Sequence, residues 1–492
     1  MLLMMKQKDF LFNISFLLLL NLLIKPFYIL GIDRGVQNAV GAENYGVFFA
    51  VFNFTLLLNM LLDFGITNFN NRNIAQNTQL LSKHISGILS LKLLLGIFYL
   101  LVVLGVGFII GYDSFQIKIL IWLAFNQFLN FFILYLRSNI AALLMFKTDS
   151  FLSVLDKLLM LIICGFLLWG NVTVQPFKIM WFVYAQTVSY VIAAAVALSI
   201  VLFKAQIVNL TWNYTFFRAI LKKSLPFALL TILMSFYGRI DSVLIERLLP
   251  STISAYQAGV YASAFRLLDA LVQIAFLFAV ILLPLFSKML KHKEDLAPII
   301  RSAFSLLFVF STTATVLLIA YRAPILEWLY SDINVESAHV FVFLIPCLIP
   351  LSITYIFGTL LTANGSLRLL NITSALAIVV SIAINIILIP ILEARGAAIA
   401  SLATQSSIAM MQSIIAFRLL KIPFSTLPYY RCLIFLSLLI VSVFFATKYL
   451  PFGAFGSLLT CGGVAIGLSA ATNLLPLKFL SEIFKKEVVK NA

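Results

Sequence analysis

The sequence predicts an all-α polytopic membrane protein with about 14 transmembrane helices. Two observations predict this fold class. First, 62% of the 492 residues are hydrophobic and only 11% are charged, which leaves too little polar surface to keep a globular protein of this size in water. Second, apolar stretches of about 20 residues follow one another along the chain, and Lys and Arg gather in every second gap between them.

The expected spans follow from the thickness of the bilayer. A hydrocarbon core of roughly 30 Å needs about 20 helical residues at about 1.5 Å per residue. The first seven spans are Phe10 to Leu30, Gly46 to Leu62, Ile85 to Ile110, Ile117 to Leu136, Phe151 to Trp169, Ile179 to Phe203 and Leu225 to Ile245. The second seven are Gly259 to Leu285, Ala303 to Ala320, His339 to Leu361, Leu369 to Pro390, Ala397 to Phe417, Cys432 to Thr447 and Phe452 to Leu475.

The distribution of basic residues predicts the orientation of these spans. Cytoplasmic loops retain Lys and Arg, whereas translocated loops are depleted in them. Most basic residues fall in the gaps on the side of the N-terminus, so both termini are predicted to be cytoplasmic. The same bias explains the net charge of +16 without nucleic acid, because no compact basic domain with interleaved aromatic residues is present in the sequence.

An internal repeat predicts how the spans are grouped. The sequence Gly31-Ile-Asp33-Arg34 and the later Gly46-Val47-Phe48 are similar to Gly238-Arg239-Ile-Asp241 and Gly259-Val260-Tyr261. Six spans separate the two pairs, so both copies have the same orientation and are related by an axis along the membrane normal. We therefore expect a six-helix lobe at 1–203, a cytoplasmic linker at 204–224, a second six-helix lobe at 225–420, and two extra transmembrane helices with a cytoplasmic tail at 421–492.

Enzymatic functions are not supported by the sequence. The gaps between spans are too short for a catalytic domain, which membrane-embedded glycan polymerases and ligases usually need. Only three His residues occur, and the chain contains no P-loop, no HExxH and no GxGxxG motif. The four cysteines lack metal-binding or paired spacing, so we expect small core residues, no metal site and no cofactor.

Three segments carry a resemblance to a known family. They are Gly41-Ala-Glu43-Asn-Tyr45-Gly46-Val47-Phe48 with Asp63-Phe64-Gly65 and Arg72, then Arg239-Ile-Asp241-Ser-Val-Leu-Ile245 with Ala258-Gly259-Val260-Tyr261 and Arg266-Leu267, and finally Asn385-Ile-Ile-Leu-Ile-Pro390 with Gly396-Ala397-Ala398-Ile399-Ala400. Their order over the whole chain resembles polysaccharide flippases of the O-antigen (Wzx-like) type, in the multidrug, oligosaccharidyl-lipid and polysaccharide (MOP) exporter superfamily.

The resemblance implies a function, a location and partners. It implies movement of undecaprenyl-diphosphate-linked oligosaccharides from the inner to the outer leaflet of a bacterial inner membrane, for O-antigen, capsule or exopolysaccharide synthesis. Alternating access of two lobes, proton or sodium coupling, and contact with polymerase or ligase machinery are part of this expectation. The fold alone does not separate this function from a cation-coupled multidrug exporter or a peptidoglycan lipid II flippase of the same superfamily.

Basic residues within the spans are the candidates for binding the diphosphate. Each costs about 2.5 to 3.5 kcal/mol at a helix centre on insertion scales, so its retention suggests a function. Lys25, Arg239 and Arg266 share a depth of roughly 8 to 10 Å below the outer boundary at about 1.5 Å per residue. Lys92 lies closer to the cytoplasmic side and could meet the diphosphate in an inward-open state. The alternative for all four is that their long side chains snorkel to the headgroups.

Two aspartates, Asp241 and Asp269, are candidates for ion coupling. A further lysine, Lys157, is expected outside the binding site. Asp269 stands three residues after Arg266 on one helix face, so a mutual ion pair competes with a role in proton or sodium coupling. Asp241 cannot pair with Arg239 along a regular helix and is expected to line the cavity or its outer exit. We expect Lys157 to lie in a loop or at the membrane interface.

Overall fold

Helices are the only regular elements in the described part of the chain. The structure is a computed structural model that describes residues 20–21, 23–67, 70, 80–143, 145–170, 175–205, 210–331, 335–449 and 453–474. The helices before the middle of the chain are η1 (Tyr28–Asp33), α2 (Arg34–Leu57), η2 (Asn59–Leu62), α4 (Leu80–Ile110), α5 (Ser114–Ala142), α6 (Phe146–Trp169), α7 (Ile179–Ala205) and α8 (Tyr214–Leu248). The later ones are α9 (Ser251–His292), α10 (Ala297–Ala320), α11 (Arg322–Leu329), α12 (Val335–Leu344), η3 (Ile345–Cys347), α13 (Leu348–Ala363), α14 (Leu367–Leu419), η4 (Phe424–Thr426), α15 (Tyr429–Tyr449) and α16 (Ala454–Ala471).

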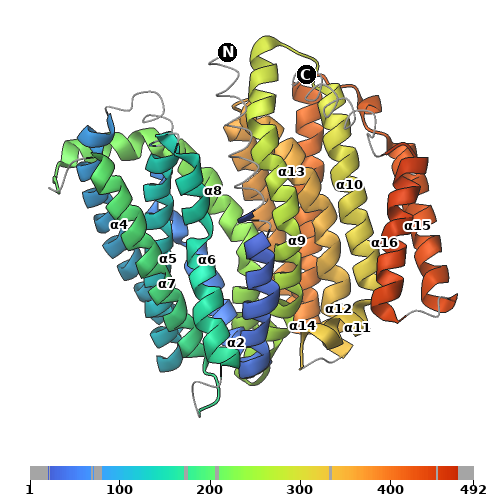
Figure 1. Ribbon diagram of the computed structural model, residues 1–492, viewed down its shortest axis with the longest axis horizontal. Helices are drawn as coiled ribbons and strands as arrows, with labels where there is room; N and C mark the ends of the chain where they lie inside the picture. The colour runs from blue at the N-terminus through green and yellow to red at the C-terminus, as the bar shows by residue number, and fades with distance from the viewer. Residues whose placement is uncertain are drawn as a thin grey trace. The chain divides into compact units, whose positions relative to one another are not determined.

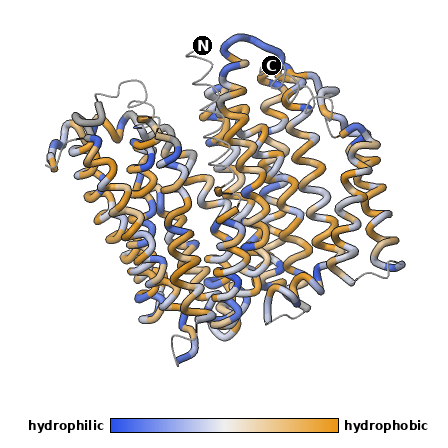
Figure 2. The backbone as a smooth tube through the Cα atoms, in the orientation of Figure 1, coloured by the Kyte–Doolittle hydropathy of each residue, from blue (hydrophilic) through white to orange (hydrophobic). Residues whose placement is uncertain are grey.

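The predicted fold class is confirmed. Among the described residues, 11 helices are long and apolar enough to cross a membrane. Two of them combine predicted spans: 23–57 joins the end of the first span to the second, and α14 contains the eleventh and twelfth. The seventh predicted span lies in α8, which carries Arg239 and Asp241 and is not among the 11. Figure 2 shows hydrophobic residues along the helices and more hydrophilic residues at their ends.

Two breaks divide the merged helices, and each lies in a gap between two predicted spans. Gly41 has a φ of 79° within α2, in the left-handed region that glycine adopts without a Cβ penalty. Glu393 has a φ of 53° within α14, three residues after Pro390. Proline removes a helical hydrogen bond, so the chain turns here between the eleventh and twelfth spans.

The described chain divides into two compact units. The first contains 1–266 and 382–397, and the second contains 267–381 and 398–492. In the first unit α5 packs against α7, α4 and α2, and α6 packs against α7, as Figure 1 shows. A core of Ile88, Leu136, Leu152 and Val201, each no more than 2% exposed, joins these helices. The predicted lobe boundaries at 203 and 225 remain a prediction.

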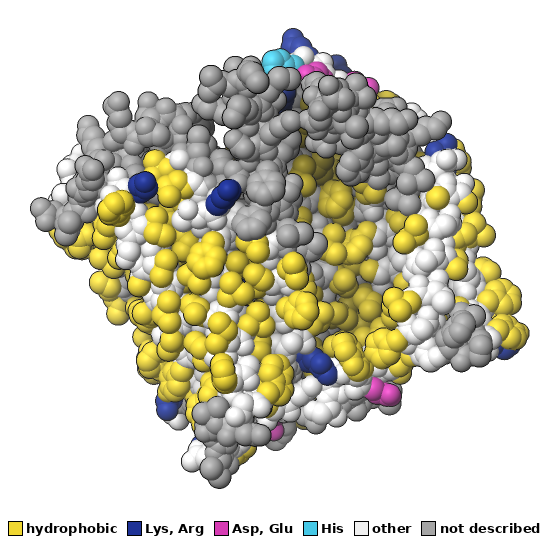
Figure 3. Space-filling view, in the orientation of Figure 1, with side chains coloured by type: hydrophobic (Ala, Val, Ile, Leu, Met, Phe, Trp, Pro, Cys, Tyr) yellow, Lys and Arg dark blue, Asp and Glu magenta, His cyan; other side chains and the backbone are white. Residues whose placement is uncertain are grey.

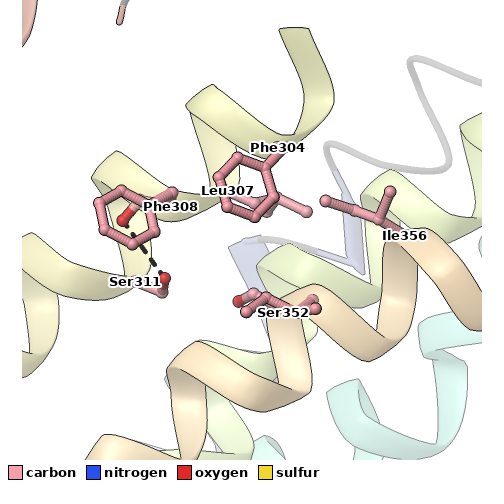
Figure 4. Close-up of a pocket in the computed structure, with 7 residues that line it drawn as sticks. Phe304, Leu307, Phe308, Ser311, Ser352 and Ile356 are labelled. Atoms are coloured by element: carbon pink, nitrogen blue, oxygen red, sulfur yellow. Dashed lines mark hydrogen bonds between the residues drawn. The ribbon is translucent and has the colours of Figure 1, made fainter. Parts of the chain in front are cut away.

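The second unit is organised around α10. This helix packs against α13, α15 and α16, so the two extra C-terminal helices are attached to the bundle. Between α10 and α13 lies a small crevice lined by Leu307, Ser311, Ser352 and Ile356, among others (Figure 4). It is apolar and too narrow for a water molecule, so it does not fit a charged substrate.

The surface of the helices is suited to lipid. Large hydrophobic side chains such as Leu101, Ile109, Phe203 and Val379 are more than 60% exposed. On the face in Figure 3, hydrophobic side chains cover the middle of the helices, and charged side chains lie near their ends. The protein is therefore a multi-pass membrane protein.

Some predictions fall outside the described residues. They are most of the first span up to residue 19, Arg72 of the first motif, residues 206–209 of the linker, and the tail from 475.

Candidate functional site

Buried charged side chains within the first unit form the candidate site. The first group joins the end of η1 to α2 and α9. Asp33 is 1% exposed and forms an ion pair with Arg266, with 2.7 Å between Oδ2 and Nε. The Tyr45 hydroxyl donates to Asp33 Oδ1 at 2.8 Å and accepts from Arg266 Nε at 3.0 Å. A buried charge is stable only when it is paired in this way, so the three residues form one polar group.

Aromatic rings connect this group to the second predicted arginine. The Arg266 guanidinium lies over the rings of Phe49 and Phe52, at 5.1 and 5.6 Å from their centroids. Phe49 contacts Phe265 edge to face, with 5.8 Å between centroids. The Arg239 guanidinium in turn lies 5.0 Å from the Phe265 centroid. Arg239 and Arg266, which the sequence analysis placed at one depth, therefore share one set of rings.

Asp241 is held by two hydrogen bonds. Its Oδ2 accepts from the Tyr261 hydroxyl at 3.0 Å, and its Oδ1 accepts from Asn385 Nδ2 at 2.8 Å. The side chain is 2% exposed. These bonds tie α8 to α9 and α14 and place Asp241 inside the protein. The predicted role of Asp241 in ion coupling remains a prediction.

Lys157 lies within the helix α6 and not in a loop, and its predicted place at the membrane interface remains a prediction. Its Nζ is 3.0 Å from Asp156 Oδ2 and 3.3 Å from the Tyr190 hydroxyl. The loop prediction was wrong, and Asp156, its neighbour in the chain, supplies the charge that permits burial of Lys157 in the helix. Lys25, before η1, lies within electrostatic reach of both residues.

Lys92 forms a separate group. Its ammonium is paired with Asp63, donates to the Leu62 carbonyl at 3.1 Å and lies 5.7 Å from the Tyr135 centroid. The side chain is 2% exposed. Lys92 therefore does not reach the surface of the protein, and its nearest partner comes from the Asp63-Phe64-Gly65 motif. Substrate binding by Lys92 remains a prediction.

The internal repeat forms a direct helix contact. Gly46 of α2 packs on Ala255 and Gly259 of α9, and Gly259 packs on Ala42. Gly46 thus contacts the residue four positions before Gly259, and Gly259 contacts the residue four positions before Gly46. Equivalent positions of the two helices therefore contact each other, as in an isologous interface. Gln37 Nε2 also donates to the Gly259 carbonyl at 3.2 Å. The contact supports the pseudo-two-fold relation that the repeat predicted.

Sequence reasoning found the basic residues of the site and missed most of their partners. Asp33, Tyr45 and Asp63 all lie in quoted motifs, yet none was assigned a partner. The prediction considered Asp269 for Arg266, whereas the structure pairs Arg266 with Asp33. Asp269 is half-buried on α9, and its role in ion coupling stays a prediction. Among the described residues, no group of three or more His, Cys, Asp or Glu could hold a metal ion.

Comparison with known families identifies the chain. A family model described as "Polysaccharide biosynthesis protein" matches residues 10–290. The chain belongs to this family. Its members include the flippases of the MOP superfamily. No curated protein has a significant sequence match to the chain.

Solved structures that are similar to the chain include a lipid flippase and multidrug transporters. The lipid II flippase MurJ in an inward closed conformation is 15% identical with a TM-score of 0.67, covering 94% of this chain and 97% of that one. An inward-facing multidrug resistance MATE transporter of the MOP superfamily is 15% identical with a TM-score of 0.61, covering 80% and 94%. A mutant of the Vibrio cholerae MATE transporter VcmN is 16% identical with a TM-score of 0.57, covering 85% and 97%.

Family and fold together define the general activity. The polysaccharide biosynthesis family and its MOP-type fold are those of flippases and transporters, and not of enzymes. This chain is therefore a membrane flippase or transporter. Arginines in its site could exchange a carboxylate partner for a phosphate, because guanidinium binds both with the same paired donors.

Proposed function

We propose that this protein moves a polyprenyl-diphosphate-linked oligosaccharide across the cytoplasmic membrane of a bacterium. The observation that carries the proposal is the match to the polysaccharide biosynthesis family over residues 10–290. A diphosphate with a sugar head cannot cross hydrocarbon unaided, and it needs cationic groups inside the protein. Lys25, Arg239 and Arg266 supply such groups in the first unit.

The pairing of Arg266 suggests how cargo is bound and released. Asp33 neutralises Arg266 in this structure, so a diphosphate must compete with the carboxylate. The Tyr45 hydroxyl contacts both partners and can stay bound to either one. Exchange between carboxylate and phosphate would keep the arginine paired throughout transport and avoid the cost of a bare buried charge.

Phe52 and Phe265 add a surface for the rest of the headgroup. Both rings are half-buried, and each lies beside an arginine of the site. Sugar rings have apolar faces that pack on aromatic rings, while their hydroxyls need polar partners. We therefore place the sugar nearest the diphosphate against these two rings, with the polyprenyl tail remaining in lipid.

Deletion of the gene tests the proposal. We expect loss of surface polysaccharide and accumulation of its lipid-linked precursor in the cytoplasmic leaflet. Wild-type protein should restore the polysaccharide, whereas an Arg239→Ala/Arg266→Ala variant of equal expression should not. Arg247→Ala is the matched control, because Arg247 pairs with Glu246 at 2.6 Å near the end of α8 in the same unit.

The same deletion distinguishes the related functions. Intact polysaccharide with accumulated lipid II would favour a peptidoglycan precursor as cargo. Intact polysaccharide with hypersensitivity to cationic drugs would favour a multidrug exporter. Either result would contradict the proposal.

A further inference from the structure

The ammonium of Lys157 is enclosed by groups that are typical of a cation site. Besides Asp156 and the Tyr190 hydroxyl, it faces the ring of Tyr28 with 4.8 Å between Nζ and the centroid, and the ring of Tyr190 at 5.3 Å. Tyr28 is 8% exposed, and the side chains of Lys157 and Asp156 are 21% and 15% exposed. One carboxylate and two aromatic faces, drawn from η1, α6 and α7, thus surround a single positive charge.

An ordinary helix ion pair does not account for this arrangement. Asp156 and Lys157 are adjacent in α6, and adjacent residues on a helix do not face each other. Both side chains must therefore turn toward a common point, and that point lies between the tyrosines of two other elements. Aromatic rings attract a desolvated cation through their negative faces, which is how proteins recognise ammonium groups of ligands.

We propose that Asp156, Tyr28 and Tyr190 form a binding site for a primary ammonium cation, and that the chain fills this site with its own Lys157. The lysine is a tethered ligand, so the site is always occupied in the wild-type protein. Removal of the lysine side chain beyond Cβ would leave room for a free alkylammonium ion of matching length.

The filled site and the charged group around Asp33 share the helix η1, which carries both Tyr28 and Asp33. The hydroxyl of Tyr28 lies in the electrostatic fields of Lys157, Asp33 and Arg266. Lys157 also shares its surroundings with Lys25. A cation held against Asp156 therefore packs on the ring of Tyr28, in the helix whose last residue, Asp33, pairs with Arg266.

Chemical rescue of a Lys157→Ala variant tests the inference in the purified full-length protein. We expect this variant to have a lower Tm than wild type in lipid nanodiscs. Titration with n-propylammonium, which replaces the missing methylenes and charge, should recover most of the lost Tm and should saturate. The uncharged 1-propanol should not do so, and neither compound should raise the Tm of wild type.

Three further variants keep the test decisive. In Lys157→Met the side chain fills the space without the charge, so propylammonium should have no effect on its Tm. Tyr28→Phe, which keeps the ring, should remain close to wild type, whereas Tyr28→Leu should lose Tm even if Lys157→Ala cannot be purified. Equal effects of propylammonium and 1-propanol, or equal stability of Tyr28→Phe and Tyr28→Leu, would overturn the cation site. Stabilisation of Lys157→Ala by Na⁺ but not by propylammonium would overturn the ammonium class.

Discussion

At the scale of single residues, the buried basic side chains of the site are paired with carboxylates. Arg266, Lys157 and Lys92 each have a carboxylate partner among the described residues. Burial of an ionisable side chain in a membrane helix costs free energy, and an oppositely charged partner reduces this cost. The burial of each residue in a pair therefore depends on the other. This dependence predicts how single and double substitutions differ.

Removal of both members of the Asp33–Arg266 pair should cost less than the two single removals added together. We expect Asp33→Ala and Arg266→Ala each to lower the free energy of unfolding by about 3 to 5 kcal/mol, because each leaves an uncompensated buried charge. The Asp33→Ala/Arg266→Ala double variant should lose clearly less than the sum of the two. Thermal unfolding in nanodiscs measures the three values, and additive losses would show that the pair is not coupled.

A second residue-scale prediction concerns Glu246, which follows the predicted seventh span. Burial raises the pKa of Glu246, while Arg247, with 2.6 Å between Nε and Oε2, opposes this rise. The folded state thus binds a proton more readily than the unfolded state. Stability should fall as pH rises from the ordinary glutamate pKa of about 4.3 to the raised value, and then level off.

Glu246→Gln removes this titration and provides the comparison. The Tm of the variant minus that of wild type should increase over the same pH interval. The Gln side chain can still accept the hydrogen bond that Gln116 donates to Glu246 at 2.7 Å. A difference that does not change with pH would show that Glu246 titrates alike in the folded and unfolded states.

How far the sequence predicts the site depends on the type of residue. Arg239 and Arg266 could be recognised because a basic residue in an apolar span is conspicuous. Their partners could not, because the partner of Arg266 comes from an element more than 200 residues away, and pairing depends on helix packing. Lys157 was wrongly expected in a loop for a different reason, since local hydropathy does not show that the neighbouring Asp156 neutralises it within a helix.

At the scale of elements, the internal repeat brings the helices α2 and α9 into direct contact. The crossing of α2 and α9 depends on Ala42, Gly46, Ala255 and Gly259, which bring two backbones into contact. Sequence similarity predicted a symmetry relation between these segments. Sequence similarity could not predict contact between these segments, because it contains no information about the distance between them.

Addition of a methyl group should disrupt this crossing. A Cβ at Gly46 would overlap the carbonyl oxygen of Ala255, and a Cβ at Gly259 would overlap that of Ala42. Since backbone cannot move aside cheaply, we expect Gly46→Ala and Gly259→Ala each to cost about 1 to 3 kcal/mol of stability. Gly105→Ala in α4 is the matched control, because a Cβ at Gly105 would have no neighbour within 4 Å. Thermal unfolding of the three variants measures the effect, and equal stability of all three would contradict it.

At the scale of the whole molecule, the fold class was predictable because bilayer thickness and the backbone's need for hydrogen bonds leave few solutions. Hydropathy also located most of the helices. Helix breaks were harder, since α14 continues through the predicted boundary with a turn at Glu393. Orientation rests on Lys and Arg alone and can be measured directly.

Accessibility of single cysteines tests the predicted orientation. Lys178 lies in a gap predicted to be outside, and Lys291 lies in the last turn of α9, predicted to be inside; both side chains are exposed. In intact cells a membrane-impermeant thiol reagent should label Lys178→Cys but not Lys291→Cys, whereas permeabilised cells should show both. The four native cysteines are buried and give a low background. Because neighbouring spans alternate in direction, the reverse labelling pattern would invert the predicted side of every loop. The basic loops would then lie outside, against the positive-inside rule, and the side that loads cargo would face away from the cytoplasm.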